Sequence, residues 1–243
     1  MTGKQRWRAV AAAIGVLLIA GAIIVALAVE GPRPGFPPRA EADRPKLLLL
    51  TSLPILFPDR VTLDSKPEPA LAALRSRYTL VPISVTDPKS LYNQRLLLMA
   101  QPQAQPAEDL VALDAWVRGG GKVLLLADPA LEWPSDRPLG SALRPPVAFP
   151  DTGLLAHWGL RLDAPGGLGQ KTVETGQSKI ETASPGTLVP TGENCSVDNG
   201  FVAHCLIEKG EVTVIADADF LNVSDPASTN LTLLLRELNR LER

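Results

Sequence analysis

The stretch Pro106–Pro129, PAEDLVALDAWVRGGGKVLLLADP, decides which fold class the chain can adopt. Its first half carries apolar residues at helical spacing, which predicts a helix with one apolar face. Gly119 can take the left-handed conformation that ends a helix, and the run Val123–Leu126 that follows is apolar without alternation. Such a run is typical of a strand covered on both faces in a parallel sheet. The stretch therefore predicts half of an α/β unit.

Carboxylates follow two of the predicted strands. Asp128 comes after Val123–Leu126, and Asp217 and Asp219 come after Val212–Ile215. Parallel neighbours end at the same edge of a sheet, so we expect the three carboxylates to meet there, with Asp217 and Asp219 on one side if their strand extends that far. Together they could hold Ca²⁺ or Mg²⁺ as a ligand or ion site. The alternative is that each carboxylate accepts backbone N–H bonds in its own turn.

Strand and helix patterns alternate through the first half of the remaining chain, and shorter patterns follow. The sequence predicts an α/β fold with a mostly parallel sheet flanked by helices, and an antiparallel β-hairpin insertion. The expected elements are strands at Lys46–Leu50, Tyr78–Val85 and Arg95–Ala100, helices at Pro69–Arg77, Leu154–Trp158 and Ser228–Leu241, and short antiparallel strands within Gln170–Val189.

The two cysteines of the chain, Cys195 and Cys205, bracket a hairpin signal. Asp198-Asn199-Gly200 favours a tight turn, so the cysteines are expected on facing strands. In an oxidising compartment they should form a disulfide, whereas the alternative is a pair of reduced, buried thiols. The chain has 2 His residues and no zinc-ligand spacing, so no metal site of the zinc type and no cofactor are expected.

The N-terminus predicts the compartment. Basic residues in 1–8 precede the uncharged run Ala9–Val29, which is long enough to span a bilayer with its basic flank in the cytoplasm. A cleavable signal peptide is the alternative, because Ala26-Leu27-Ala28 resembles a cleavage site, but the apolar run is longer than a signal core. We expect an uncleaved single-pass protein of the inner membrane: a cytoplasmic tail over 1–8, the span, a Pro-rich tether over 30–45, and an extracytoplasmic (periplasmic) domain over 46–243.

Composition excludes several classes of binding protein. The formal net charge is -2, so the chain lacks the basic character of a nucleic-acid binder. Aromatic residues make up only 5% of the chain, which argues against a carbohydrate cleft or a platform on which bases stack.

Four segments together resemble a known family. Ala112–Pro129, Leu154–Leu160, Glu211–Val223 and Asn230–Leu241 are similar, in order and spacing, to segments of the GldG-like family of ABC-type uncharacterised transport system auxiliary proteins. The resemblance extends from about Lys46 to the C-terminus. It implies a domain of amidotransferase-like or flavodoxin-like fold that generally lacks the catalytic apparatus. It also implies ABC permease and ATPase subunits as partners in the bacterial envelope. The apolar run Ala9–Val29 itself predicts the contact with the membrane.

The residues themselves also lack a catalytic nucleophile. An amidotransferase or α/β-hydrolase needs Cys or Ser on a strand-to-helix elbow, but the predicted elbow Ala127–Ala130 contains neither. We therefore expect a non-enzymatic accessory subunit of an ABC transporter with no catalytic residues. Two alternatives stay open: a hydrolase or amidotransferase relative with an unrecognised catalytic set, for example one that uses Asp128, and an envelope binding module unrelated to transport.

Overall fold

The computed structural model describes residues 35–56, 68–138, 140, 141, 143–176 and 178–243. The predicted span Ala9–Val29 and the cytoplasmic tail lie outside these residues. Within them, no helix is both long enough and apolar enough to cross a membrane. The compact unit begins at Phe36, because Arg77 stacks over the Phe36 ring and donates to the carbonyl of Pro37 at 2.6 Å. The predicted tether, residues 30–45, therefore overlaps this unit from Phe36 onward.

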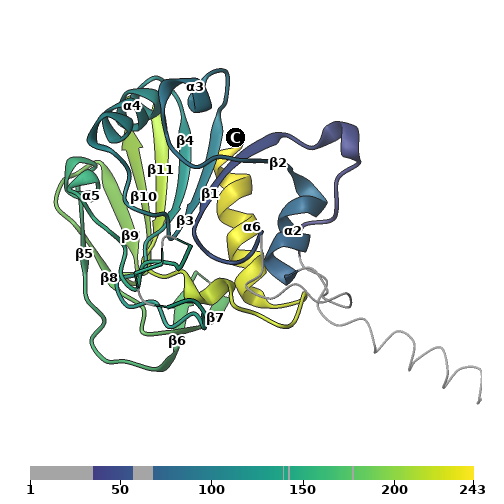
Figure 1. Ribbon diagram of the computed structural model, residues 1–243, viewed down its shortest axis with the longest axis vertical. Helices are drawn as coiled ribbons and strands as arrows, with labels where there is room; N and C mark the ends of the chain where they lie inside the picture. The colour runs from purple at the N-terminus through teal and green to yellow at the C-terminus, as the bar shows by residue number, and fades with distance from the viewer. Residues whose placement is uncertain (1–34, 57–67, 139, 142, 177) are drawn as a thin grey trace, which may run out of the picture. The chain divides into compact units, whose positions relative to one another are not determined.

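One seven-stranded sheet organises the unit, with the order β2-β1-β3-β4-β11-β10-β9 (Figure 1). The first five strands in this order run parallel, and β10 and β9 continue the sheet antiparallel. The sheet strands are β1 (Lys46–Thr51), β2 (Thr79–Pro82), β3 (Leu96–Ala100), β4 (Lys122–Leu126), β9 (Cys195–Asp198), β10 (Val202–Ile207) and β11 (Gly210–Ile215). The prediction of an α/β fold with a mostly parallel sheet is confirmed.

Helices flank the sheet, with α2 packed against α6 and α3 against α4. The connection from β1 to β2 contains α2, and the connection from β3 to β4 contains α4. The two connections run in opposite directions along the sheet. Because such connections are right-handed, α2 and α4 lie on opposite faces of the sheet. The central strands are covered on both faces, as their continuous apolar runs predict. The helices are η1 (Glu41–Asp43), α2 (Pro69–Arg77), α3 (Pro88–Leu91), α4 (Ala107–Arg118), α5 (Leu154–His157), η2 (Asp219–Leu221) and α6 (Thr229–Leu241).

The chain between β4 and β9 forms two separate antiparallel pairs. These are β5 (Leu160–Asp163) with β8 (Thr187–Pro190), and β6 (Gln170–Thr175) with β7 (Ser178–Ala183). Short antiparallel strands were expected within Gln170–Val189, but β5 was not. The strand β5 pairs with β8 in the register Leu160↔Pro190 to Asp163↔Thr187. The paired residues are 24 to 30 positions apart in the chain, so a pattern within a short stretch of sequence cannot predict the pairing.

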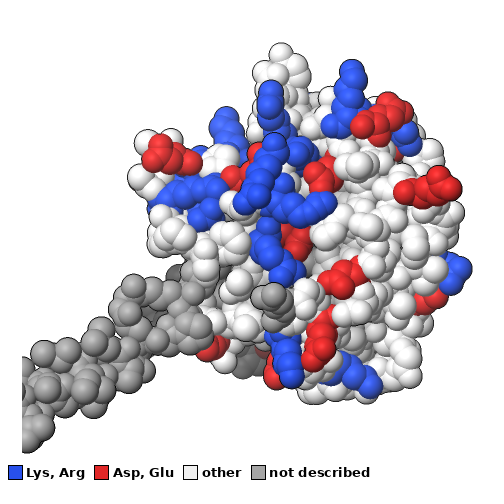
Figure 2. All heavy atoms as spheres, turned by 180° about the vertical axis from the view of Figure 1, so that it is seen from behind, with Lys and Arg blue, Asp and Glu red and all other residues white. Residues whose placement is uncertain are grey.

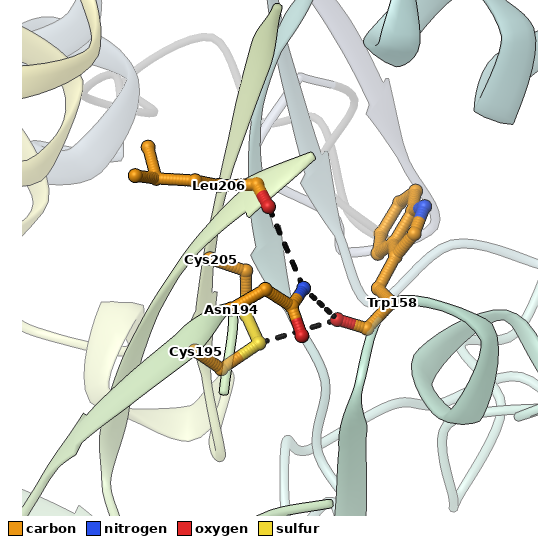
Figure 3. Close-up of a disulfide and its surroundings, with 5 residues drawn as sticks. All are labelled: Trp158, Asn194, Cys195, Cys205 and Leu206. Atoms are coloured by element: carbon orange, nitrogen blue, oxygen red, sulfur yellow. Dashed lines mark hydrogen bonds between the residues drawn. A yellow bond between two sulfur atoms is a disulfide. The ribbon is translucent and has the colours of Figure 1, made fainter. Parts of the chain in front are cut away.

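The disulfide lies on the hairpin β9–β10, where Cys195 and Cys205 are directly opposite and bonded (Figure 3). Asn199 and Gly200 both have positive φ, 49° and 70°, as the Asn-Gly turn predicts. Rather than forming an insertion apart from the sheet, the hairpin extends the sheet through the pairing of β10 with β11. The side chain of Asn194 donates to the carbonyl of Trp158 at 2.8 Å, which joins the hairpin to the end of α5.

The glycine turn between α4 and β4 differs from the prediction. Gly119 ends the helix with a right-handed φ of -72°, so its expected left-handed conformation is wrong. Gly120 takes the positive φ instead, at 112°, and donates to the carbonyl of Val117 at 2.8 Å. Three successive glycines leave the position of the left-handed residue undetermined by sequence, because each can adopt it without a steric cost.

Candidate functional site

The carboxyl ends of β4 and β11 bring the expected aspartates to one edge of the sheet. The two strands are parallel neighbours in the register Leu126↔Ile215, so Asp128 and Asp217 each lie two residues beyond a paired strand end. Asp128 and Asp217 are fully buried, and Asp219 is 7% exposed. The fold therefore places these three carboxylates at the same edge of the sheet, as the sequence predicts. We call them the acidic cluster.

Asp128 joins the two strand ends through backbone hydrogen bonds. Its Oδ1 accepts from the N–H of Ala130 at 2.8 Å, and its Oδ2 accepts from the N–H groups of Ala218 and Asp219 at 3.0 and 3.4 Å. The residue thus accepts a bond in its own turn, as the alternative interpretation states, and also two bonds from the segment after β11. Both oxygens are occupied by main chain, which gives Asp128 an architectural role.

Asp217 and Asp219 point to different partners, because β11 ends at Ile215 and Asp219 starts η2. The strand therefore does not extend far enough to place both side chains on one side, which was the condition of that expectation. Asp217 Oδ1 accepts from the Thr182 hydroxyl and from the Phe220 N–H, the latter at 2.8 Å, whereas Oδ2 has no partner among the described residues. Asp219 Oδ2 accepts from the N–H of Glu132 at 2.6 Å.

Two further polar residues contact this edge, and the sequence pattern did not identify them. The Glu132 carboxylate accepts from the Ser184 hydroxyl and, at 3.1 Å, from the N–H of Gly169. Ser184 is fully buried and has a positive φ of 47°, which is uncommon for a residue with a side chain. Neither residue comes directly after a strand of the main sheet. The neighbouring sequence therefore does not predict that they lie beside the aspartates.

Burial and mutual repulsion raise the pKa values of the acidic cluster. The pKa of Asp219 rises to about 7, chiefly through burial, with the charges of Asp128 and Glu132 adding to the shift. Burial also raises the pKa of Asp217 well above its usual value, and the neighbouring Asp128 charge raises it further. The pKa of Asp128 is raised by burial although three backbone N–H groups oppose the change. Of the three carboxyl groups, Asp219 therefore changes its protonation state near neutral pH.

No set of three His, Cys, Asp or Glu side chains in the described part of the chain is arranged to hold a metal ion. The carboxylate oxygens instead face backbone N–H groups and hydroxyls, as in the turn-capping alternative. The residues that follow β4 at the expected elbow, Ala127–Ala130, include no Ser or Cys. Ion binding by the acidic cluster stays a prediction, and thermal melting with Ca²⁺, Mg²⁺ and a chelator would test it.

Stability should rise as the pH falls through the neutral range. The folded pKa of Asp219, about 7, lies above its ordinary value of 3.8, so the folded state binds more protons between these values. From pH 8 to pH 5 we expect the free energy of unfolding to increase by roughly 2 kcal/mol. Chemical denaturation at both pH values measures this change. Asp219→Asn should flatten the dependence, whereas Glu193→Gln at an exposed position should not; an unchanged slope in Asp219→Asn would contradict the assignment.

The opposite edge of the sheet carries basic residues. Lys46 and Lys122 start β1 and β4, and Arg95 directly precedes β3. Lys and Arg side chains gather in the upper part of the face seen in Figure 2, with fewer acidic side chains among them. Some are neutralised, since Lys122 Nζ lies 3.8 Å from the Glu211 carboxylate.

Comparison with known proteins identifies one family. Residues 44–165, which are 122 of the 243 residues, match the family described as ABC-type uncharacterized transport system. No curated protein matches the chain. The matched segment runs from the residues before β1 to those after β5, and it includes β4 and Asp128 but neither Asp217 nor Asp219.

Several solved structures share the general arrangement at low identity. Gan42B, a GH42 beta-galactosidase from G. stearothermophilus, has a TM-score of 0.50 at 11% identity over 81% of this chain. An exo-beta-1,4-mannosidase from Opitutaceae bacterium strain TAV5 gives 0.48 at 12% over 84%, and a putative ThuA-like protein from Bacteroides uniformis gives 0.48 at 11% over 85%. The chain covers 30%, 36% and 95% of these structures, respectively. Such likeness concerns the fold alone, and the amidotransferase-like arrangement stays a prediction.

Proposed function

Because the chain belongs to the ABC-type uncharacterized transport system family, which supports an accessory role in transport, we propose a more specific function for it. It is a non-enzymatic, membrane-anchored accessory subunit whose domain docks on a permease or binds a ligand outside the cytoplasm. The observation that carries this proposal is the family match over residues 44–165, which spans the parallel strands from β1 to β4.

The absence of catalysis is supported by the residues at the carboxyl edge. Asp128 uses both carboxylate oxygens to accept main-chain bonds, so it lacks an oxygen directed at a substrate. Cys195 and Cys205 are joined to each other, and a disulfide sulfur is no nucleophile of the thiolate kind. These contacts favour the accessory role over a hydrolase or amidotransferase that uses Asp128.

The proposed compartment is supported by the disulfide and by the N-terminal sequence. Disulfides persist in oxidising compartments and are rare in the cytosol of most cells. An apolar run at Ala9–Val29 with a basic flank favours the same orientation, with the domain outside the cytoplasm. Anchoring would also raise the effective concentration of the domain for partners in the same membrane.

Co-purification from native membranes tests the proposed function. We expect the full-length protein, expressed at its native level and extracted in mild detergent, to bring down a multi-span permease and its ATPase. A matched variant in which residues 1–29 are replaced by a cleavable export signal reaches the same compartment without the anchor. It should stay folded, as judged by its melting curve, and lose most of the association. Recovery of the full-length protein alone would overturn the accessory role and leave a binding module unrelated to transport.

A further inference from the structure

The helix α4 has an apolar face on its outer side, in addition to the face that it buries. The buried face includes Leu113 and Val117, which have no exposed surface. Residues three, four and seven positions apart lie on the same side of a helix. On the outer side of α4 this spacing gives Glu108, Val111, Ala112, Ala115 and Gly119. A surface helix ordinarily directs charged and polar side chains to solvent on this side, so the outer face of α4 is unusually apolar.

A groove of about 910 Å³ lies along this face, between α4 and the segment that contains α3 (Figure 1). The Thr86 hydroxyl donates to the carbonyl of Asp109 at 3.1 Å, near the start of α4. Near its end, Trp116 Nε1 donates to the carbonyl of Gln94 at 3.2 Å. The two walls are thus joined at both ends, and the groove is part of the fold. We call it the α4 groove.

Large apolar side chains at the α4 groove are open to solvent. Tyr92 in the lining is 73% exposed, and Val111 on the adjoining face of α4 is 69% exposed. The Trp116 ring lies directly against Gly121, where a Cβ atom would come within 2.4 Å of ring atoms. Tyr and Trp are enriched where proteins contact one another. The α4 groove therefore has the composition of a protein interface.

Opposite charges lie at the two ends of the outer face of α4. The exposed Glu108 is in the first turn of the helix. The exposed Arg95 lines the groove together with Gly119–Gly121, which follow the last turn. In a two-fold dimer the same patch meets itself in the reverse direction, so each end of one copy meets the other end of its mate. The face is therefore complementary in charge to a second copy of itself.

We propose that the α4 groove is the interface of a homodimer, in which α4 packs antiparallel to α4 of a second copy across a two-fold axis. With the axis between Ala112 and Ala115, each of these residues faces the other one in the second copy. Their small side chains allow the two helix axes to approach to roughly 8–10 Å. Glu108 then lies opposite Gly119 of the second copy, beside its Arg95, and symmetry forms this ion pair twice.

The oligomeric state of the purified full-length protein in mild detergent tests the interface, and it does not depend on the accessory role in transport. Sedimentation velocity at micromolar concentration should give the mass of two chains. Ala115→Glu places a carboxylate from each copy at the centre of the interface and should weaken the dimer by at least about a hundredfold.

The matched control is Ala72→Glu, the same change at an exposed position of α2, which lies on the opposite face of the sheet. The control should leave the dimer intact, and circular dichroism checks that both variants stay folded. A wild-type protein that is monomeric, or a dimer that survives Ala115→Glu, would refute the proposal. Either result would leave the co-purification with a permease unaffected.

Charge reversal tests the antiparallel pairing, also if Ala115→Glu does not fold. Arg95→Glu and Glu108→Arg each turn two attractions into repulsions, so either change alone should weaken the dimer roughly tenfold. An equimolar mixture of the two single variants should recover the wild-type affinity, because in the mixed dimer each acid again faces a base. Neither variant can form such a pair within one chain, so recovery reports contact between copies. A mixture that associates no more tightly than the separate variants would contradict the arrangement.

Discussion

Gly210→Ala is expected to destabilise the protein by roughly 3 kcal/mol or more, or to prevent folding. A Cβ atom at this position would lie 1.9 Å from the carbonyl oxygen of Val117 and 2.5 Å from that of Gly121. Both contacts are with backbone, which cannot rotate away as a flexible side chain can. The glycine is therefore needed for space where the start of β11 passes the end of α4.

Urea denaturation measures this effect, with Gly166→Ala as the matched control. A Cβ atom at Gly166 meets nothing within 4 Å, so the same chemical change there should leave stability within about 0.5 kcal/mol. A Gly210→Ala protein as stable as the control would show that β11 does not pass α4 as closely as described.

Asp128→Ala is expected to cost about 3 kcal/mol or more, because it removes the acceptor of three N–H groups at once. Asp128→Asn should have an intermediate cost, since it keeps one carbonyl oxygen but directs an NH₂ group at a backbone donor. Equilibrium unfolding of both variants at pH 7 gives the comparison. Either change also removes the charge that raises the pKa values of Asp217 and Asp219, so the pH dependence of stability should weaken.

The outcome separates an architectural role of Asp128 from a functional one. If Asp128→Ala keeps full stability but loses a ligand or partner, the carboxylate acts in binding, and the main-chain bonds are incidental. If stability falls and the refolded protein still associates with its partners, the residue serves the fold, as its contacts with the Ala130, Ala218 and Asp219 amides indicate.

Continuous apolar runs make the central strands predictable from sequence. Lys122–Leu126 and Leu96–Ala100 lack alternation, and each is buried on both faces of the sheet. The Asn-Gly turn likewise predicts that Cys195 lies opposite Cys205, and the two residues are paired in β9 and β10. These features depend on local periodicity and turn chemistry, which a short stretch of sequence contains.

Contacts between distant segments are not predictable in this way. Thr182 of β7 donates to Asp217, and the N–H of Glu132 donates to Asp219, although 35 and 87 residues separate the partners. A cavity is likewise lined by Ser52 after β1, Ser84 after β2 and Gln103 after β3, and its position follows from strand order rather than from any motif. From a single sequence, the order of strands in a sheet can be inferred only from general rules about the handedness of connections and the pairing of consecutive strands.

The position of the domain outside the cytoplasm is the claim on which the proposed function depends. The oxidation state of Cys195 and Cys205 in growing cells tests it most directly, because they are the 2 cysteines of the chain and no other thiol contributes. Cells at native expression are quenched with acid, and free thiols are alkylated with a maleimide polymer that shifts the protein on a gel. The account predicts no shift unless the denatured protein is first reduced. A protein whose two cysteines are both alkylated without reduction would place the domain in the cytoplasm and contradict the account.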